Sequence, residues 1–319
     1  IKDNKKWYKK YGYVNLCYNV YGLDIENFRN QDDYFERYIN KKERFSIHHK
    51  RLNPRKYTII TANKYLFYAY LEKIWPGITP NTYFLFGKTK VMSPISQRHL
   101  TIMEAIKTLK DGTYICKAQF GEAGSSINKI EVKNNKVIIN DGKKTEKQFL
   151  DELKEERYLI QDFVKQHKDM AVFNKKTLNT IRIITTRFNK KAHFFSAIAR
   201  FGTDNGSVGD NISQGGVAVA VNEKGELDKY GYYYELPRTT EHPNSHIKFE
   251  GYKIPNWDQV INAITTLHSF IPGLSAIGWD VAITEDGVKI VEANSNYCSK
   301  IMQITSGGLK EKWEELKEK

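Results

Sequence analysis

The spacing of apolar residues predicts two amphipathic helices in the first third of the chain. In the range 64–74, Leu66, Tyr70 and Ile74 recur every four residues, which is close to the period of a helix. The range 98–110 repeats this spacing with two leucines, an isoleucine and a methionine on one face. Both ranges are therefore expected to be helices that bury one side.

From residue 113 onward the pattern changes to short runs of β-branched and aromatic residues bounded by Gly, Asn or Asp. Such runs are typical of strands joined by tight turns, and Asp286-Gly287 indicates a hairpin. Helices are expected only at about 145–154 and 256–270, and from Leu309 to the end of the sequence. The predicted strands are 113–119, 127–132, 136–140, 158–164, 180–188, 193–201, 217–222, 276–284 and 288–294.

This order of elements predicts an α+β fold. Helices come first and mostly antiparallel strands follow, whereas a doubly wound parallel sheet would alternate strands with helices. No G-x-G-x-x-G motif follows a first strand, so the usual dinucleotide signature is missing.

The amino-acid composition indicates a globular protein without a transmembrane segment. Apolar residues make up 40% of the chain, charged residues 27%, and the mean hydropathy is −0.59. These values are typical of a globular protein and argue against disorder. No apolar run approaches the roughly 18 residues of a membrane span, so no transmembrane segment is expected. Cys17, Cys116 and Cys298 lack disulfide or zinc spacing and suit reduced thiols in a cytoplasmic protein.

The formal net charge of +13 is unevenly distributed. Residues 1–56 hold 14 Lys and Arg against 7 Asp and Glu, about half of the excess. Such a balance suits nucleic acid, an anionic membrane or an anionic substrate, and a lysine-rich solvated surface is the ordinary alternative. Because no motif interleaves basic and aromatic residues, no nucleic-acid partner is expected.

Three oxygen-bearing side chains converge on the predicted hairpin 276–294. Asp280 lies on its first strand, and Glu292 and Asn294 lie two residues apart on the second, which places them on one face. Carboxylate and amide oxygens suit Mg²⁺, which proteins usually bind together with substrate phosphates. The alternative is the polar outer face of an ordinary hairpin.

A lysine followed by a Gly/Ser-rich loop forms a second candidate. Lys117 ends a predicted strand, and the loop leads into the next strand. Glycines let backbone N–H groups approach phosphate oxygens, serines add donors, and lysine adds a point charge. An ordinary flexible hairpin loop is the alternative. The loop residues concerned are Gly121, Gly124, Ser125 and Ser126.

Two arginines form a third candidate. Arg182 and Arg200 lie on adjacent predicted strands, and a polar loop with Asn211 and Gly216 follows. Guanidinium groups beside a Gly-rich loop suit an anionic group. The alternative is a pair of surface arginines beside a disordered loop.

Taken in order, these motifs resemble the ATP-grasp superfamily. The strings NTIRI, DN-x3-GG and GWDVAITEDGVKIVEAN look most like its sugar-transfer-associated branch, over roughly residues 60–308. The resemblance implies two α+β lobes whose antiparallel sheets hold ATP between them, preceded by a mainly helical N-terminal segment. The implied domains are an N-terminal helical region at 1–100, a lid subdomain at 101–165 and a C-terminal subdomain with the metal site at 166–319.

The resemblance also implies roles for individual residues. Asp280, Glu292 and Asn294 match ligands of Mg²⁺, of which two ions are expected. Lys117 matches a lysine on the nucleotide phosphates, and Lys64 matches a second one, with an asparagine in place of the usual acid before it. The remaining matches are the lid loop Gly121, Gly124, Ser125 and Ser126, the adenine hinge Gln161, Asp162, Phe163 and Val164, and Arg182, Arg200, Asn211 and Gly216 near the transferred phosphoryl group and the acyl substrate.

Members of this superfamily usually join a carboxylate to an amine. ATP phosphorylates the carboxylate, and the amine then displaces phosphate to form an amide. The expected activity is therefore an ADP-releasing ligase with ATP and Mg²⁺ as cofactors and a small-molecule carboxylate and amine as substrates, in surface polysaccharide or glycan-conjugate biosynthesis. The alternative within the superfamily is a kinase that phosphorylates an alcohol of a sugar-like substrate.

The basic first 56 residues suit a glycan or lipid-linked acceptor. A cytoplasmic protein with such a segment could contact the inner face of the membrane peripherally, through attraction to anionic lipids and without insertion.

Overall fold

The computed structural model describes most of the chain after residue 51 and short parts before it. The described residues are 2–12, 14–15, 18, 21–24, 34, 52–87, 91, 100–120, 127–204, 209–233 and 238–318.

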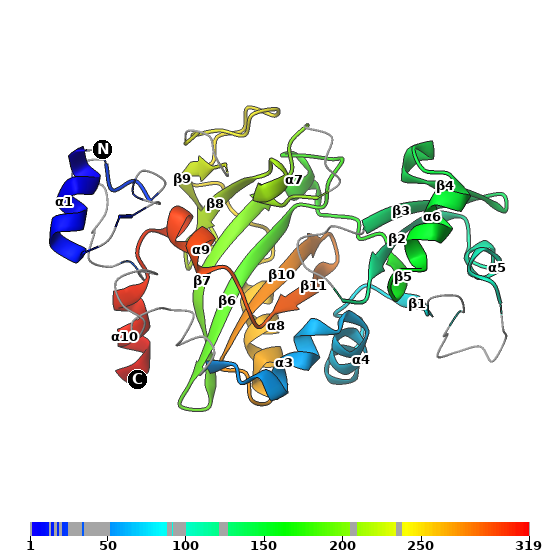
Figure 1. Ribbon diagram of the computed structural model, residues 1–319, viewed down its shortest axis with the longest axis horizontal. Coiled ribbons are helices and arrows are strands. Elements are labelled where there is room, and N and C mark those ends of the chain that lie inside the picture. Colours follow the sequence, from blue (N-terminus) through cyan, green and yellow to red (C-terminus); the bar gives the residue numbers. More distant parts are fainter. Residues whose placement is uncertain are drawn as a thin grey trace. The chain divides into compact units, whose positions relative to one another are not determined.

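Two compact units make up the chain, and each contains one antiparallel sheet (Figure 1). Unit 1 comprises residues 1–59, 166–288 and 292–319, and unit 2 comprises 60–165 and 289–291. Helices combined with two antiparallel sheets confirm the predicted α+β class. The three-part domain division stays a prediction.

Unit 2 is built on a five-stranded sheet in the order β1-β5-β2-β3-β4. Helices α5 and α6 contribute Ile106, Phe149 and Leu153 to a core that also includes residues of the strands. The elements are α4 (Lys64–Ile74), β1 (Thr82–Phe86), α5 (Ile102–Lys107), β2 (Gly112–Ala118), β3 (Ile127–Lys133), β4 (Lys136–Ile139), a 3₁₀ turn (Asn140–Gly142), α6 (Glu146–Leu153) and β5 (Tyr158–Asp162).

The helix expected at 98–110 is shorter in the structure because its ends are capped. Thr101 accepts a hydrogen bond from the backbone N–H of Glu104, whose carboxylate accepts the Thr101 N–H in return. This capping box starts α5 at Ile102. Helix α4 agrees with the prediction at both ends.

Unit 1 is built on a six-stranded sheet in the order β11-β10-β6-β7-β8-β9. Strand β10 is buried along nearly its whole length, since α8 covers one face of the sheet and α9 and α10 pack on the other. The elements are α3 (Arg55–Ala62, entering unit 2 at residue 60), α7 (Lys168–Ala171), β6 (Thr180–Phe188), β7 (Lys191–Phe201), η3 (Ile212–Gln214), β8 (Val217–Val221), β9 (Leu227–Tyr232), α8 (Trp257–Phe270), β10 (Ala276–Thr284), β11 (Gly287–Asn294), α9 (Ser299–Ser306) and α10 (Lys310–Glu318).

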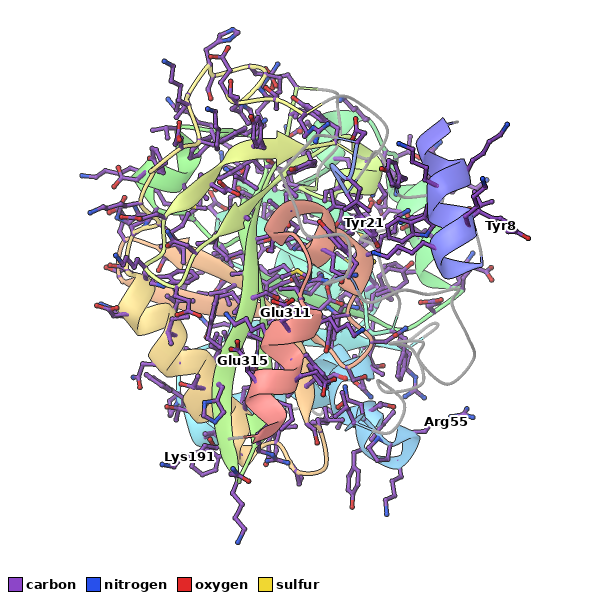
Figure 2. The ribbon with its side chains drawn as sticks, turned by 90° about the vertical axis from the view of Figure 1, so that its left-hand side faces the viewer. Tyr8, Tyr21, Arg55, Lys191, Glu311 and Glu315 are labelled. Carbon is purple, nitrogen blue, oxygen red and sulfur yellow. The ribbon has the colours of Figure 1, made fainter. Side chains whose placement is uncertain are left out.

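Among the described side chains of the N-terminal helix α1 (Lys2–Tyr11), Trp7 is the buried aromatic residue. Trp7 is 3% exposed and meets the ring of Tyr18 edge-on, whereas Tyr8 is 55% exposed and points outward (Figure 2). Most of the basic first 56 residues lie outside the described residues. Among the helices that the structure describes, none is long and apolar enough to cross a membrane.

Two-residue turns fix the register of two hairpins. Asn134 and Asn135 join β3 to β4, and Asn189 and Lys190 join β6 to β7, all four with positive φ. Two consecutive positive φ values define the type I′ turn, whose twist matches that of the strands. Lys191, at the start of β7, projects from the tip of the longer hairpin (Figure 2).

A close backbone approach shapes the connection from β7 to β8. The N–H of Gly216 donates to the carbonyl of Asn211 at 3.1 Å, folding residues 210–216 back on themselves. A Cβ on Gly216 would lie only 2.4 Å from the carbonyl oxygen of Asp210. This loop therefore needs a glycine to keep Asp210 in place.

One buried histidine ties α8 to the sheet. His268 contacts the Thr185 hydroxyl through Nδ1 at 2.7 Å and the Leu274 carbonyl through Nε2 at 3.0 Å. The Trp279 indole donates to the same hydroxyl at 2.7 Å. Burial lowers the pKa of His268 to about 4, so the neutral ring is the native form at neutral pH.

Lowering the pH is expected to destabilise unit 1 through His268. Below an unfolded-state pKa of 6.5 the unfolded chain binds the proton, while the folded ring stays neutral down to about pH 4. The free energy of unfolding therefore falls as the pH drops through this window, by on the order of 3 kcal/mol in total. Urea titrations between pH 7 and pH 4 measure this loss.

His268→Gln removes the titrating ring, so its unfolding free energy should change less with pH than that of the wild type. His246→Gln is the matched control, because the His246 side chain is 72% exposed, and it should keep the wild-type dependence. Equal slopes for wild type and His268→Gln would contradict the assignment.

Gly216→Ala should lower the free energy of unfolding by roughly 1–3 kcal/mol, since backbone atoms of Asp210 must shift to admit the new Cβ. Gly209→Ala in the same loop is the control, because its Cβ would meet only the far end of the Gln214 side chain, at 2.9 Å. Urea denaturation of both variants tests the difference, and equal losses would count against it.

Candidate functional site

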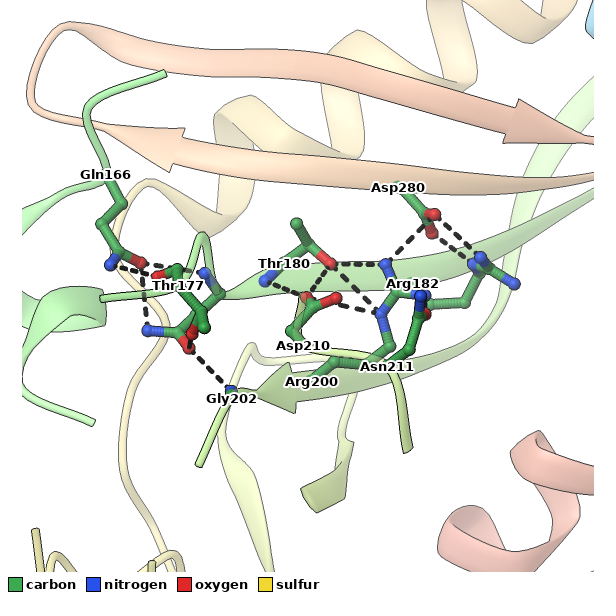
Figure 3. A network of polar contacts seen from close by, with 10 residues as sticks. Gln166, Thr177, Thr180, Arg182, Arg200, Gly202, Asp210, Asn211 and Asp280 are labelled. Atoms are coloured by element: carbon green, nitrogen blue, oxygen red, sulfur yellow. Dashed lines mark hydrogen bonds and ion pairs between the residues drawn. The ribbon is translucent and has the colours of Figure 1, made fainter. Parts of the chain in front are cut away.

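A buried carboxylate on β10 of unit 1 is bound by two arginines from β6 and β7 (Figure 3). The register of β10 and β6 places Asp280 directly opposite Arg182. Arg182 donates to both oxygens of Asp280, from Nε to Oδ1 and from Nη2 to Oδ2 at 2.8 Å. Arg200 on β7 forms an ion pair with Oδ2 at 3.1 Å. The fork geometry makes the Arg182 contact strong and directional.

Thr180 and Asp210 hold Arg200 from its other side. Thr180 pairs with Arg200 across β6 and β7, and its hydroxyl accepts from Arg200 Nε at 3.1 Å and Nη2 at 2.6 Å. The same hydroxyl donates to Asp210 Oδ2 at 2.5 Å, and the Thr180 N–H donates to that oxygen at 2.9 Å. Arg200 Nη1 also donates to Asn211 at 3.3 Å. Arg200 is thus fixed by three residues besides Asp280.

Charges in this cluster are buried and balanced, two guanidinium groups against two carboxylates. Asp280 is 4% exposed, Asp210 6% and Arg200 8%. Burial alone would raise the pKa of Asp280, but Arg182 and Arg200 outweigh it and hold this pKa below its usual value. For Asp210, burial dominates over Arg200 and Thr180 and raises the pKa. Removing one member would leave an uncompensated buried charge, a change that typically costs several kcal/mol.

An amide network fixes the chain just before Thr180. Gln166 Nε2 donates to the Asn174 carbonyl at 2.9 Å, and its Oε1 accepts from both the backbone and side-chain N–H of Asn179 at 3.0 Å. Asn179 Oδ1 accepts from the Gly202 N–H at 3.1 Å, which joins the start of β6 to the end of β7 (Figure 3). This network aligns Thr180 with Arg200.

The predicted metal ligands Asp280, Glu292 and Asn294 all belong to unit 1. Glu292 and Asn294 lie on β11 and are partly exposed, whereas Asp280 is buried. In the described part of the chain, no three His, Cys, Asp or Glu side chains are grouped to hold a metal. Two carboxylates and an amide are nevertheless hard oxygen donors of the number that Mg²⁺ takes from proteins. The donor set fits Mg²⁺, provided that an oxygen of Asp280 becomes available.

Lys117, the lysine expected at the nucleotide phosphates, lies in unit 2 and is 7% exposed. Its ammonium donates to the Tyr68 hydroxyl at 2.7 Å and to the Val291 carbonyl at 3.5 Å. The Tyr68 hydroxyl in turn donates to the Val291 carbonyl. Sequence reasoning missed Tyr68, which looks like an ordinary buried residue of an amphipathic helix.

Lys64 is the first residue of α4 and is partly exposed. Asn63, which replaces the acid expected before it, is the N-cap: its side chain accepts the Leu66 N–H at 3.2 Å. The same oxygen accepts from Gln119 Nε2 at 2.8 Å. Asparagine and aspartate cap helices equally well, so the substitution keeps the local structure.

The expected adenine hinge begins in the last two residues of β5, Gln161 and Asp162, and continues into Phe163 and Val164. The carboxylate of Asp162 accepts from Asn81 and from Tyr83, each at 2.7 Å, and the bond to Asp162 raises the pKa of Tyr83 to about 12. The Gln161 side chain is buried. Phe163 is 41% exposed, Val164 is partly exposed, and the boundary between the units follows at residues 165 and 166.

The last predicted site residues belong to two loops, the one between β7 and β8 and the lid loop. Gly216 holds the loop of Asp210, and Asn211 contacts Arg200, so both lie at the arginine cluster. The lid-loop residues Gly121, Gly124, Ser125 and Ser126 lie outside the described residues.

Solved structures similar to this chain include several ligases, all at low identity. They include the ATP-grasp ligase PsnB with minimal precursor, Mg and ADP (13% identity, 84% of this chain, 62% of that chain, TM-score 0.43). D-alanine-D-alanine ligase from Helicobacter pylori is 15% identical, with 84% of this chain and 64% of that chain covered and a TM-score of 0.48. L-amino acid ligase from Bacillus licheniformis is 9% identical, with 77% of this chain and 44% of that chain covered and a TM-score of 0.43. The chain spans less than two thirds of the length of each.

A search of curated protein sequences finds no match. The model of one family, described as sugar-transfer associated ATP-grasp, matches residues 43–318. This match covers most of the chain and confirms the resemblance inferred from the motifs. The chain therefore belongs to the sugar-transfer associated ATP-grasp family.

Proposed function

We propose that this chain is an ATP-dependent carboxylate–amine ligase that releases ADP and forms an amide through an acyl phosphate. The observation that carries the proposal is the buried cluster of Arg182, Arg200 and Asp280, in a chain of the ATP-grasp family. Phosphoryl transfer requires fixed positive charge and exact positioning, more than covalent chemistry by the protein.

The two cysteines within the described residues, Cys116 and Cys298, offer no support for a covalent mechanism. Cys116 is fully buried, and burial raises the pKa of its thiol, which keeps it protonated and unreactive. Cys298 is a free thiol just before α9. The groups described above instead handle charge, which suits direct attack of a substrate carboxylate on the γ-phosphate of ATP.

Within unit 1, Asp280, Glu292 and Asn294 are the proposed ligands of Mg²⁺. The bound ion would neutralise charge on the β- and γ-phosphates of ATP. Arg200 and Arg182 are the proposed binding groups for the transferred phosphoryl group and the acyl substrate, because guanidinium groups match both in geometry.

Within unit 2, Lys117 and Lys64 are proposed to bind nucleotide phosphates, and residues 161–164 to receive adenine. Lys117 donates to the Tyr68 hydroxyl and the Val291 carbonyl, which hold its ammonium group in a defined, buried position. A lysine placed in this way supplies a point charge for a phosphate.

The substrates are proposed to belong to surface polysaccharide or glycan-conjugate biosynthesis. The family description, sugar-transfer associated, supports this, as does the basic first segment, which suits a polyanionic or lipid-linked acceptor. A location in the cytoplasm, at the inner face of the membrane, would give access to such an acceptor.

The purified chain should release ADP, and not AMP, when given ATP, Mg²⁺, its carboxylate and its amine. Hydroxylamine added in place of the amine should trap the acyl phosphate as a hydroxamate, because an amine-like nucleophile displaces phosphate. A panel of uronic acids and amines, followed by ADP release and product mass, measures this.

Glu292→Gln is the inactive control, since it removes one proposed metal ligand from a partly exposed position and leaves the hydrogen bonds between Arg182, Arg200 and Asp280 in place. AMP in the products would contradict the mechanism. A stable phosphate ester among the products, without any hydroxamate, would contradict the ligase and support the kinase alternative.

Lys117→Met should weaken the binding of Mg–ADP by about tenfold or more, the loss of one charge-assisted hydrogen bond. Isothermal titration calorimetry measures the dissociation constant. Lys133→Met, an exposed lysine at the end of β3, is the matched control and should bind as the wild type does. Equal affinities in the two variants would remove Lys117 from the nucleotide site.

A further inference from the structure

The two arginines on Asp280 are held very differently. Within the described residues, every hydrogen bond from the Arg182 side chain goes to Asp280. Arg200 additionally has the Thr180 hydroxyl, Asn211 and the Asp210 carboxylate as partners. The Arg182 side chain is also the more exposed, at 17% against 9%. Arg182 is therefore the less firmly anchored of the two.

The oxygens of Asp280 are already crowded. Oδ1 accepts from Arg182, and Oδ2 accepts from Arg182 and lies 3.1 Å from Arg200. A carboxylate offers about four lone-pair sites, so three of them are taken. A magnesium ion on either oxygen would sit at about 2.0–2.1 Å and repel a guanidinium bound to the same group.

Departure of the two arginines has unequal consequences. If Arg200 left, Thr180 would lose two hydrogen bonds and Asp210 would remain buried without its cation, which is a costly state. If Arg182 left, Asp280 alone would lose hydrogen bonds, and the incoming cation would replace the charge of the guanidinium beside Asp280 and Glu292. Arg182 also interacts electrostatically with Glu292, so it lies close to both carboxylates proposed to bind metal.

We propose that a divalent cation displaces Arg182, and not Arg200, from Asp280, and that the released guanidinium then binds the anionic group of the acyl substrate. This inference rests on the proposed function, in which Asp280 is a metal ligand. The anion site then depends on the metal. While the Arg182 guanidinium is bound to Asp280, it cannot bind a carboxylate or phosphate of the substrate. The nucleotide with its metal therefore binds before the carboxylate substrate.

Arginine side-chain NMR of the ¹⁵N-labelled full chain tests the exchange directly. The Nε–Hε signals of the two residues are assigned with Arg182→Lys and Arg200→Lys. On addition of Mg²⁺ and ADP, the Arg182 signal should move while the Arg200 signal keeps its position. Inorganic phosphate should then move the Arg182 signal further, and should leave it unchanged when Mg–ADP is absent.

Calorimetry separates this inference from the function on which it rests. No Mg–ADP binding would overturn both. Binding with an unmoved Arg182 signal, with movement of Arg200 instead, or with an equal response to phosphate without the metal, would overturn the exchange alone and leave the metal site standing.

A second measurement uses the sign of an affinity change. If Arg182 competes with the cation, Arg182→Gln should tighten Mg–ADP binding by about tenfold, the value of one charge-assisted hydrogen bond. An arginine that only supports the fold would give weaker binding. Arg187→Gln is the matched control on the same strand, because Arg187 donates to the Ile271 carbonyl and not to Asp280. Unchanged or weaker binding in Arg182→Gln, with an intact melting transition, would overturn the proposal.

Discussion

The ion pairs of Asp280 constrain three strands and one loop of unit 1. A carboxylate on a strand buried on both faces is tolerated only when cations meet it there. That requirement fixes the register of β10 against β6, since a slip of one residue would turn Arg182 to the opposite face. It also fixes Arg200 on β7, which in turn requires Thr180, Asp210 and the glycine-dependent loop that carries Asp210.

Both units use a hydroxyl group to hold a cation. In unit 1 the Thr180 hydroxyl accepts from Arg200 and donates to Asp210, and in unit 2 the Tyr68 hydroxyl accepts from Lys117 and donates to a backbone carbonyl. A hydroxyl can act as donor and acceptor at once, so each of these hydroxyl groups orients a cation and donates a hydrogen bond of its own to an acceptor. In unit 1 the carboxylates of Asp210 and Asp280 balance the charge of Arg200.

The sequence predicted the strands, the hairpin of β10 and β11, and the charged residues of the site, because their signals are local. Periodicity marks the strands, and an Asp or Arg within an apolar run is conspicuous. Thr180 and Asp210 were missed because their signals are not local. A threonine at the start of a strand and an aspartate in a polar loop have no distinctive sequence pattern. The register of β6 and β7 and the fold of the loop place them beside Arg200. Strands β1 and β9 were missed because each is short and lies next to turn residues.

The type I′ turn between β6 and β7 has a consequence for how the chain folds. A two-residue turn closes its hairpin at little entropic cost, so Arg182 and Arg200 come together on one face through local contacts. In the folded protein, Asp210, ten residues after Arg200, compensates one of the two charges. Asp280 lies 98 residues beyond Arg182, and until β10 docks the second charge is unpaired beside the first. Like charges in such proximity repel, and dissolved salt screens that repulsion in the open hairpin but hardly reaches it once buried. Salt should therefore accelerate the formation of this sheet more than it changes the stability of the finished protein, because the repulsion acts before β10 docks.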